Sequence, residues 1–286
     1  MPENTAKKVC LIGWPAGYSR SPLIHGYWLK RHDIAGSYHI RPVRPGELED
    51  FLTGFTASGL AGCNVTIPHK ETAFEIISHQ NRSWVSPRAK RLGAINTVWI
   101  ENGVLHADNT DAYGFLTALR EEYPHWRPEG KNVLIIGAGG AAHAIAYDFA
   151  DAGTKTITVA NRTLEHAVRL AENFGPPLVP AALADVADLL GGVDILVNAT
   201  SLGMDGHPQL RLPLEALPPR AIVADIVYAP LETGLLRDAA ARGLKTLGGL
   251  GMLMHQAVPG FEKWFGVRPE VTPELRKLLE ADIASC

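Results

Sequence analysis

Polar side chains that could bind a small ligand and react with it gather in four short clusters of this 286-residue chain. Most are hydroxyls and amides, which suit a ligand with several hydroxyl groups of its own. Lys70 and Asp111 add one ammonium group and one carboxylate, and a positioned lysine can exchange a proton with a substrate oxygen. The pattern predicts an acid–base site for a polyhydroxylated ligand. The clusters are Ser19 to Pro22, Asn64 to Lys70, Asn96 with Thr97, and Asn109 to Asp111.

Both charged residues also have an ordinary structural interpretation. Lys70 would suit the solvated start of a helix, and Asp111 would suit the N-cap of a helix that runs through Phe115 and Leu119. Burial lowers the pKa of a lysine and a neighbouring carboxylate raises it, so the sequence leaves the pKa of Lys70 open. The residue types alone do not decide between the two interpretations.

The elements that must position these clusters alternate between strands and helices, which indicates an α/β fold. One helix is expected to start at Ser21 and Pro22, with Ser21 as N-cap and Pro22 at the first helical position. The clusters fall at strand ends or in the loops that follow, and ligands of open α/β sheets collect at the carboxyl ends of strands. The clusters are therefore expected to share one pocket. The strands expected in this part are residues 9–12, 37–43, 61–67, 94–100 and 104–107, the last two joined by a hairpin turn at Asn102 and Gly103.

A glycine turn follows the apolar run that begins at Val133 and has the pattern of a dinucleotide-binding turn. Gly137 permits a tight bend, Gly139 lets the backbone approach a pyrophosphate, and Ala142 keeps the next helix close to the sheet. Glycines between a strand and a helix can also serve a plain turn. A helix over 141–152 and a strand over 156–160 complete a βαβ unit, so dinucleotide binding is the favoured interpretation.

The end of that second strand bears on which dinucleotide binds. A carboxylate there accepts from the ribose 2′-hydroxyl of NAD, whereas an arginine accommodates the 2′-phosphate of NADP. The residues present are Asn161, Arg162 and Thr163, which favour NADP. The alternative makes Arg162 a solvated side chain, with Thr163 as N-cap of the next helix.

The remaining elements complete the expected fold class: α/β, with two domains. Strands over 193–197, 221–227 and 245–247 continue a doubly wound Rossmann domain, which we expect to span 112–249 and to bind NADP. Two final helices, over 250–265 and 273–283, are expected to return to the first domain. The N-terminal α/β substrate-binding domain would then comprise 1–111 and 250–286, and the Rossmann domain would be inserted in it.

Composition limits the class of protein further. Charged residues make up 20% of the chain, hydrophobic residues 46%, and the net charge is -3, as in ordinary globular proteins. No basic block suggests nucleic acid, and no apolar run suggests a membrane span or signal peptide. Three scattered cysteines fit neither a metal site nor a disulfide framework, so we expect no metal and a cytoplasmic location. The chain is expected to be a monomer or a homodimer.

The motifs together resemble those of the shikimate dehydrogenase family, in order and nearly end to end. In the first half the resemblance rests on Ser19 and Ser21, on Asn64 to Lys70, on Gly93 to Thr97 and on Asn109 to Asp111. In the second half it rests on the turn at Gly137, on Asn161 to Thr163, on Asn198 to Met204, on Asp225 to Tyr228 and on Met252 to Gln256.

The resemblance implies NADP-dependent, reversible reduction of 3-dehydroshikimate to shikimate, a step of aromatic amino-acid biosynthesis. It implies that Lys70 is the acid–base residue and Asp111 its partner. Ser19 and Ser21, aided by Tyr228, would bind the substrate carboxylate. Ring hydroxyls would be held by Thr66, Asn96, Asp111 and Gln256. The implied cofactor-binding residues are Gly137, Ala138, Gly139, Gly140, Ala141, Asn161, Arg162, Thr163, Thr200, Ile226, Gly249 and Met252.

Departures from the family pattern leave two alternatives open. His166 stands on the helix where the family often has a second basic residue for the 2′-phosphate, and Tyr18, Ala107 and Ala112 replace more usual residues near the site. A paralogue that oxidises quinate or an aminoshikimate with NAD or NADP is one alternative. The other is a non-catalytic sensor of shikimate or quinate, against which the presence of Lys70 and Asp111 argues.

Overall fold

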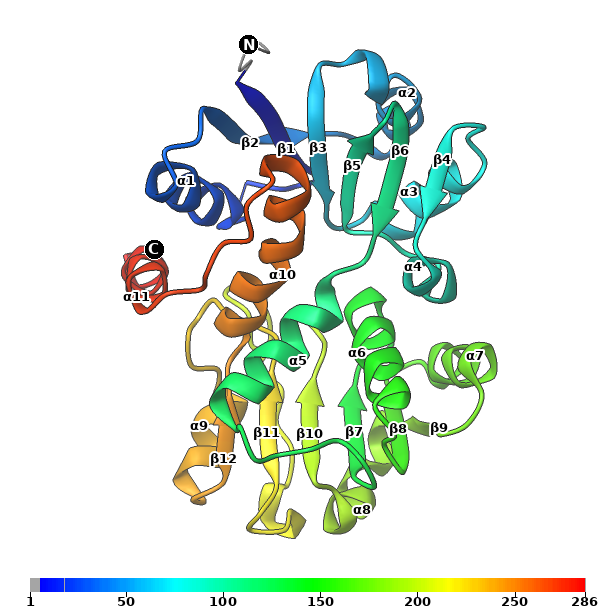
Figure 1. The fold of residues 1–286 in the computed structure, drawn as a ribbon. Helices are drawn as coiled ribbons and strands as arrows, with labels where there is room; N and C mark the ends of the chain where they lie inside the picture. Colours follow the sequence, from blue (N-terminus) through cyan, green and yellow to red (C-terminus); the bar gives the residue numbers. More distant parts are fainter. Residues whose placement is uncertain (1–5, 18, 286) are drawn as a thin grey trace. The chain divides into compact units, whose positions relative to one another are not determined.

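The computed structural model describes residues 6–17 and 19–285, which form two compact units. The first unit runs up to Thr110 and includes Gln256–Leu279, and the second comprises Asp111–His255 and the residues from Glu280 onward. Each unit contains its own six-stranded sheet (Figure 1). Among the described helices, none combines the length and the apolar character that crossing a membrane would require.

The sheet of the first unit has the strand order β2-β1-β3-β5-β6-β4. Strand β5 runs antiparallel to β3 and β6, and the other pairs are parallel. The predicted hairpin is confirmed, since Asn102 and Gly103 both have positive φ angles between β5 and β6. The elements are β1 (Lys7–Gly13), α1 (Ser21–Arg31), β2 (Gly36–Pro42), α2 (Leu48–Thr53), β3 (Leu60–Val65), α3 (Lys70–Ser78), β4 (Ser83–Val85), α4 (Pro87–Leu92), β5 (Thr97–Glu101) and β6 (Val104–Asp108).

Several predicted strand boundaries and one predicted cap are wrong, among them the strands expected over 193–197 and 221–227, which run over Ile195–Asn198 and Ile222–Asp225. Strand β3 ends at Val65 because the chain turns at the exposed Ile67 and at Pro68, and β5 begins at Thr97, three residues later than expected. Helix α1 begins at Ser21 itself, so that Ser21 is not the N-cap. The Oγ atom of Ser19 accepts from the backbone N–H of Ser21 instead, at 3.3 Å.

Helix α10 (Gly249–Phe265) packs closely on one face of the first sheet through Trp264. The indole Nε1 of Trp264 donates to the carbonyl oxygen of Val98 at 2.9 Å. A Cβ atom on Gly62 would lie only 1.9 Å from that nitrogen, so glycine is required there for the indole to fit. Helices α2 and α3 supply side chains to the apolar core on the opposite face of the sheet.

The sheet of the second unit is entirely parallel, with the order β12-β11-β10-β7-β8-β9. This is the strand order of a doubly wound Rossmann domain. Helices α5, α6 and α7 contribute to the core on one face, and α8 and α9 to the core on the other. The elements are α5 (Asp111–Glu122), β7 (Asn132–Ile136), α6 (Gly140–Asp151), β8 (Thr156–Asn161), α7 (Leu164–Phe174), β9 (Leu178–Ala182), α8 (Val186–Leu189), β10 (Ile195–Asn198), β11 (Ile222–Asp225), α9 (Gly234–Ala241) and β12 (Lys245–Leu247).

The predicted fold class is confirmed, including the return of C-terminal residues to the first unit. Helix α10 contributes its residues from Gln256 onward to that unit, and α11 (Pro273–Ala284) contributes its residues up to Leu279. Two contacts attach the segment before α11 to α1. The hydroxyls of Tyr27 and Thr272 are 2.9 Å apart, and the indole of Trp28 donates to the carbonyl of Glu270 at 3.0 Å.

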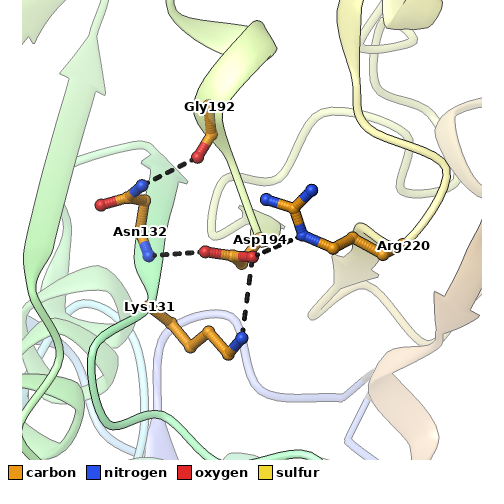
Figure 2. Close-up of polar contacts among 5 residues, drawn as sticks. All are labelled: Lys131, Asn132, Gly192, Asp194 and Arg220. Carbon is orange, nitrogen blue, oxygen red and sulfur yellow. Dashed lines mark hydrogen bonds and ion pairs between the residues drawn. The ribbon is translucent and has the colours of Figure 1, made fainter.

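A buried carboxylate joins the amino ends of the central strands in the second unit (Figure 2). Asp194, just before β10, accepts from the backbone N–H of Asn132 at 3.0 Å. Its other oxygen lies 3.1 Å from Nε of Arg220 and 3.9 Å from Nζ of Lys131. Because the Arg220 side chain is 68% exposed, that ion pair contributes little, and the bond to the backbone of β7 is the main stabilising contact.

A histidine is enclosed among aromatic rings in the core of the first unit. His25 is fully buried and stacks on Tyr38 at a centroid distance of 4.1 Å, with Trp28 edge-on at 5.6 Å. Neither ring nitrogen has a hydrogen-bond partner among the described residues. Burial lowers the pKa of His25 from 6.5 to about 3, so the ring is neutral in the folded protein.

Replacing His25 with phenylalanine should remove an acid-dependent loss of stability. Between pH 6.5 and about 3 the unfolded chain protonates His25 and the folded protein does not, so stability is lost as the pH falls through this range. The free energy of unfolding should fall by about 1.4 kcal/mol per pH unit relative to that of His25→Phe. Urea unfolding at pH 7, 6 and 5 measures the difference. A pH-independent difference would contradict this, and His39→Gln, at an exposed position of β2, serves as the control.

Candidate active site

The predicted carboxylate-binding serines lie together at the start of α1. The hydroxyl of Ser19 donates to that of Ser21 at 3.2 Å, and Ser21 is buried. Next to them is Tyr38, a buried tyrosine on β2. Burial raises its pKa well above the usual range, while a hydrogen bond with the Ser21 side chain lowers it. Tyr18, the neighbouring residue that departs from the family pattern, lies outside the described residues.

Asn64 joins three strands of the first sheet through its buried amide. Its Oδ1 accepts from the hydroxyl of Tyr38 on β2 at 2.6 Å. Its Nδ2 donates to the carbonyl of Asn96 at 3.0 Å and lies 3.2 Å from Oγ1 of Thr97, at the start of β5. A buried amide with unmet hydrogen bonds would be costly, so these contacts fix the end of β3 and the start of β5 relative to the middle of β2.

The side chain of Asn96 continues this network toward α10. Its Oδ1 accepts from the backbone N–H of Thr110 at 2.9 Å and lies 2.9 Å from Oγ1 of Thr97. The hydroxyl of Thr110 donates to the carbonyl of Gln256 at 2.8 Å. The structure thus brings together Ser21, Asn96 and the backbone of Gln256, three of the predicted substrate-binding positions. Tyr38 and Thr110 complete the connection.

Lys70 is the first residue of α3, and its backbone is fixed to the same network. Its carbonyl accepts from the N–H of Ile95 at 3.0 Å, directly before Asn96. The preceding His69 is buried, with Nε2 2.7 Å from the carbonyl of Val43. Upstream, the N–H of Thr66 donates to the carbonyl of Ile12 at 2.9 Å. The loop that carries Thr66 and Lys70 is therefore held at both ends.

Asp111 and Tyr228 belong to the second unit. Asp111 is buried and is the first residue of α5, directly after Thr110. Tyr228 lies three residues beyond the end of β11 and is half-buried. Asp111 is not the N-cap of α5, because it already lies inside the helix.

The glycine turn after β7 contains glycines of two kinds. Gly137 has a φ angle of +106°, and a Cβ there would lie 2.8 Å from Cγ2 of Thr200, so the fold itself requires glycine. Gly139 and Gly140 have φ angles open to other residues, and a Cβ on either would meet nothing within 4 Å. Space of this kind beside a helix N-terminus is what a pyrophosphate occupies.

The turn fits a dinucleotide in its charge as well as its shape. Gly139 is the N-cap of α6, so no side chain caps the helix, and the first turn has no acidic residue. The backbone N–H groups and the positive end of the helix dipole are left to an anion. Ala138 and Ala141 flank the two glycines, and Ala142 is fully buried against the sheet as predicted.

The residues at the end of β8 leave a cation at the surface. Asn161 ends the strand, and its Nδ2 donates to the carbonyl of Thr163 at 2.8 Å. Thr163 is the N-cap of α7 by position, although its side chain makes no capping bond. Arg162 is exposed, and in the described parts of the chain no carboxylate forms an ion pair with it.

The other predicted cofactor positions lie at the carboxyl ends of β10, β11 and β12. Thr200 follows β10 and packs against Gly137. Gly249 begins α10, and a Cβ there would lie 2.1 Å from the carbonyl oxygen of Ile226, so helix and loop are in close contact. Met252 is partly buried against the core that also contains α6. These ends are where ligands of doubly wound sheets bind.

The second unit is a Rossmann domain with open space at Gly139 and Gly140, which we call the glycine cradle, and the first unit has a buried polar site. This combination defines a dinucleotide-dependent oxidoreductase. Two family profiles match: "Shikimate dehydrogenase substrate binding domain" over residues 11–98 and "Shikimate / quinate 5-dehydrogenase" over residues 121–204. The shikimate dehydrogenase (NADP(+)) of Nitrobacter winogradskyi is 50% identical over 281 residues, 98% of either chain. This chain belongs to the shikimate dehydrogenase family, as its motifs predicted.

Solved structures agree with this assignment. The shikimate 5-dehydrogenase of Thermus thermophilus, crystallised with NADP(H) and shikimate, has a TM-score of 0.82 and 35% identity, covering 98% of this chain and 99% of its own. Quinate dehydrogenase from Corynebacterium glutamicum, in complex with NAD, has a TM-score of 0.86 and 30% identity, covering 96% and 99%. The two-domain Rossmann arrangement is common to the family.

Substituting Gly139 with alanine should impair dinucleotide binding without harming the fold. The methyl group meets no atom of the described residues but enters the space expected for the pyrophosphate, so the Kd for NADP+ should rise about tenfold, a loss of about 1.4 kcal/mol in binding free energy. Isothermal titration calorimetry gives the Kd, and thermal unfolding should give an unchanged Tm. Gly137→Ala is the contrasting variant, with a lowered Tm. Unchanged NADP+ affinity in Gly139→Ala would refute the assignment of the cradle.

Proposed function

We propose that this protein catalyses the reversible, NADP-dependent reduction of 3-dehydroshikimate to shikimate in aromatic amino-acid biosynthesis. Full-length identity of 50% to a relative of that name supports the reaction. The observation that carries the site assignment is the buried network that joins Ser21, Asn96 and Gln256. Side chains that specify a polyhydroxylated acid are expected to be held rigidly, and this network holds Ser21, Asn96 Oδ1 and the backbone of Gln256 through hydrogen bonds.

In the proposed mechanism the substrate is held by neutral donors and acceptors. Ser19 and Ser21, with Tyr228, bind its carboxylate, and Thr66, Asn96, Asp111 and Gln256 bind its ring hydroxyls. NADPH, when bound, supplies the hydride. Lys70 Nζ donates a proton to the ketone oxygen during reduction and accepts it back during oxidation, with Asp111 as its partner.

In the second unit, the residues proposed to hold NADP surround the carboxyl ends of the strands. The turn from Gly137 to Ala141 would bind the pyrophosphate, and the segment from Asn161 to Thr163 would bind the 2′-phosphate through Arg162. Thr200, Ile226, Gly249 and Met252 would bound the rest of the cofactor. We assign residues 1–111 and 250–286 to substrate binding and catalysis, and 112–249 to cofactor binding.

The setting of the activity is proposed from composition and family membership. We expect a cytoplasmic enzyme, a monomer or homodimer, with small molecules as its ligands and neither nucleic acid nor membrane as a partner. The described residues contain no group of three or more potential metal ligands, and the mechanism requires no metal.

Lys70→Ala should reduce kcat for shikimate oxidation by about 10²–10⁴-fold, because the acid–base group is removed while the substrate-binding side chains stay in place. The rate of NADPH formation at saturating shikimate and NADP+ is the measurement. Lys90→Ala, an exposed lysine on α4 in the same unit, is the matched control and should retain full activity. Turnover undiminished by Lys70→Ala would remove Lys70 from the mechanism.

A quinate dehydrogenase is the second candidate, favoured by the similarity to the enzyme from Corynebacterium glutamicum and by His166 near Arg162. A histidine side chain carries no permanent charge, so this residue type holds a 2′-phosphate more weakly than a lysine or an arginine does. We expect kcat/KM to be highest for shikimate with NADP+ when shikimate and quinate are each assayed with NAD+ and NADP+. A higher value for quinate with NAD+ would favour the second candidate instead.

A further inference from the structure

A buried carboxylate at the end of β11 has no part in the proposed chemistry. Asp225 is 2% exposed and accepts three hydrogen bonds: from Nδ2 of Asn198 at 3.0 Å, from the N–H of Val227 at 3.0 Å, and from Oγ1 of Thr233 at 2.8 Å. Burial raises the pKa of this carboxyl group, and the three donors act in the opposite direction. Burying a carboxylate costs free energy, so its presence here calls for a structural or functional reason.

One of its two side-chain partners, Asn198, shapes the loop after β10. Asn198 is fully buried, and its Oδ1 accepts from the backbone N–H of Thr200 at 3.1 Å and from the Thr200 hydroxyl at 2.7 Å. Its Nδ2 also donates to the carbonyl of Leu202 at 3.0 Å. In the sheet, Asn198 is paired with Asp225 on one side and with Ile136, the residue before Gly137, on the other.

The hydrogen-bonded pair of Asn198 and Asp225 positions two loops that are in close contact with glycines. The methyl group of Thr200 is the atom that a Cβ on Gly137 would meet at 2.8 Å, and the carbonyl of Ile226 is the atom that a Cβ on Gly249 would meet at 2.1 Å. The loop that follows Asp225 is bonded to the start of α10, since the N–H of Gly249 donates to the carbonyl of Val227 at 3.2 Å. Small shifts of either loop would therefore displace the glycine turn or the start of α10.

We propose that Asp225 is a positioning residue for the cofactor. Through Asn198 and Val227 its carboxylate holds the loop after β10 against the glycine turn, and the loop after β11 against the start of α10. The cofactor site is thereby kept in its binding form without contact between Asp225 and the cofactor. This inference rests on the proposed function, because it takes the bound dinucleotide to be NADP.

Asp194 provides a matched control for a merely structural role. It is a second buried aspartate of the same sheet and accepts from a backbone N–H, but it lies at the amino ends of the strands (Figure 2). Replacing it should lower stability while leaving the cofactor loops in place. Asp225→Asn keeps one accepting oxygen for Asn198 and Val227 but removes the negative charge that strengthens both bonds, whereas Asp225→Ala removes all three bonds.

The test titrates NADP+ into the full-length variants by calorimetry and measures the Tm of each without cofactor. Asp225→Ala should raise the Kd about tenfold or more and Asp225→Asn about threefold, while Asp194→Ala and Asp194→Asn lower the Tm and change the Kd by less than about twofold. In steady-state assays of Asp225→Asn, KM for NADP+ should rise while kcat stays within about twofold.

Equal effects of the Asp225 and Asp194 variants on the Kd would overturn the proposal, as would an unchanged Kd in Asp225→Ala. If Asp225→Ala does not fold, the comparison of Asp225→Asn with Asp194→Asn decides in the same way. Failure of the proposed function is a separate result: the unaltered protein would bind NADP+ but fail to oxidise shikimate.

Discussion

The first unit depends on one buried amide. Asn64 lies at the end of β3, and its hydrogen bonds reach Tyr38 on β2 and residues 96 and 97 at the start of β5. An amide in this position is stable only if each of its polar atoms has a partner, so the strand ends cannot move independently. Two of the proposed substrate-binding residues, Thr66 and Asn96, lie directly after β3 and directly before β5, so their rigidity follows from that of the amide.

In the turn after β7, one glycine is required by the fold and two others are required only if a ligand binds there. Gly137 is fixed by its positive φ angle and by contact with Thr200, whereas none of the described residues requires glycine at 139 or 140. Glycines that the fold does not need mark the place where another molecule comes close. For the 2′-phosphate we propose the corresponding place beside Arg162, which is exposed directly after β8.

Features encoded by neighbouring residues could be predicted from the sequence. The βαβ unit around Gly137, the hairpin at Asn102 and Gly103, and the class of the fold all follow from periodicity and turn chemistry. Tyr38 could not be predicted as part of the site, because its role arises from a contact with Asn64, 26 residues away. The predicted N-cap at Ser21 is wrong because the helix already begins at Ser21. The backbone N–H of Ser21 donates to the hydroxyl of Ser19, two residues upstream.

We propose that the polar network of the first unit and the glycine cradle of the second serve one reaction on shikimate with NADP. The most direct measurement is a crystal structure of this protein with NADP+ and shikimate bound. The account predicts the shikimate carboxylate at Ser19 and Ser21, the reacting hydroxyl at Lys70 Nζ, and the pyrophosphate at Gly139 and Gly140. Shikimate bound away from both serines, or a pyrophosphate away from the cradle, would contradict it.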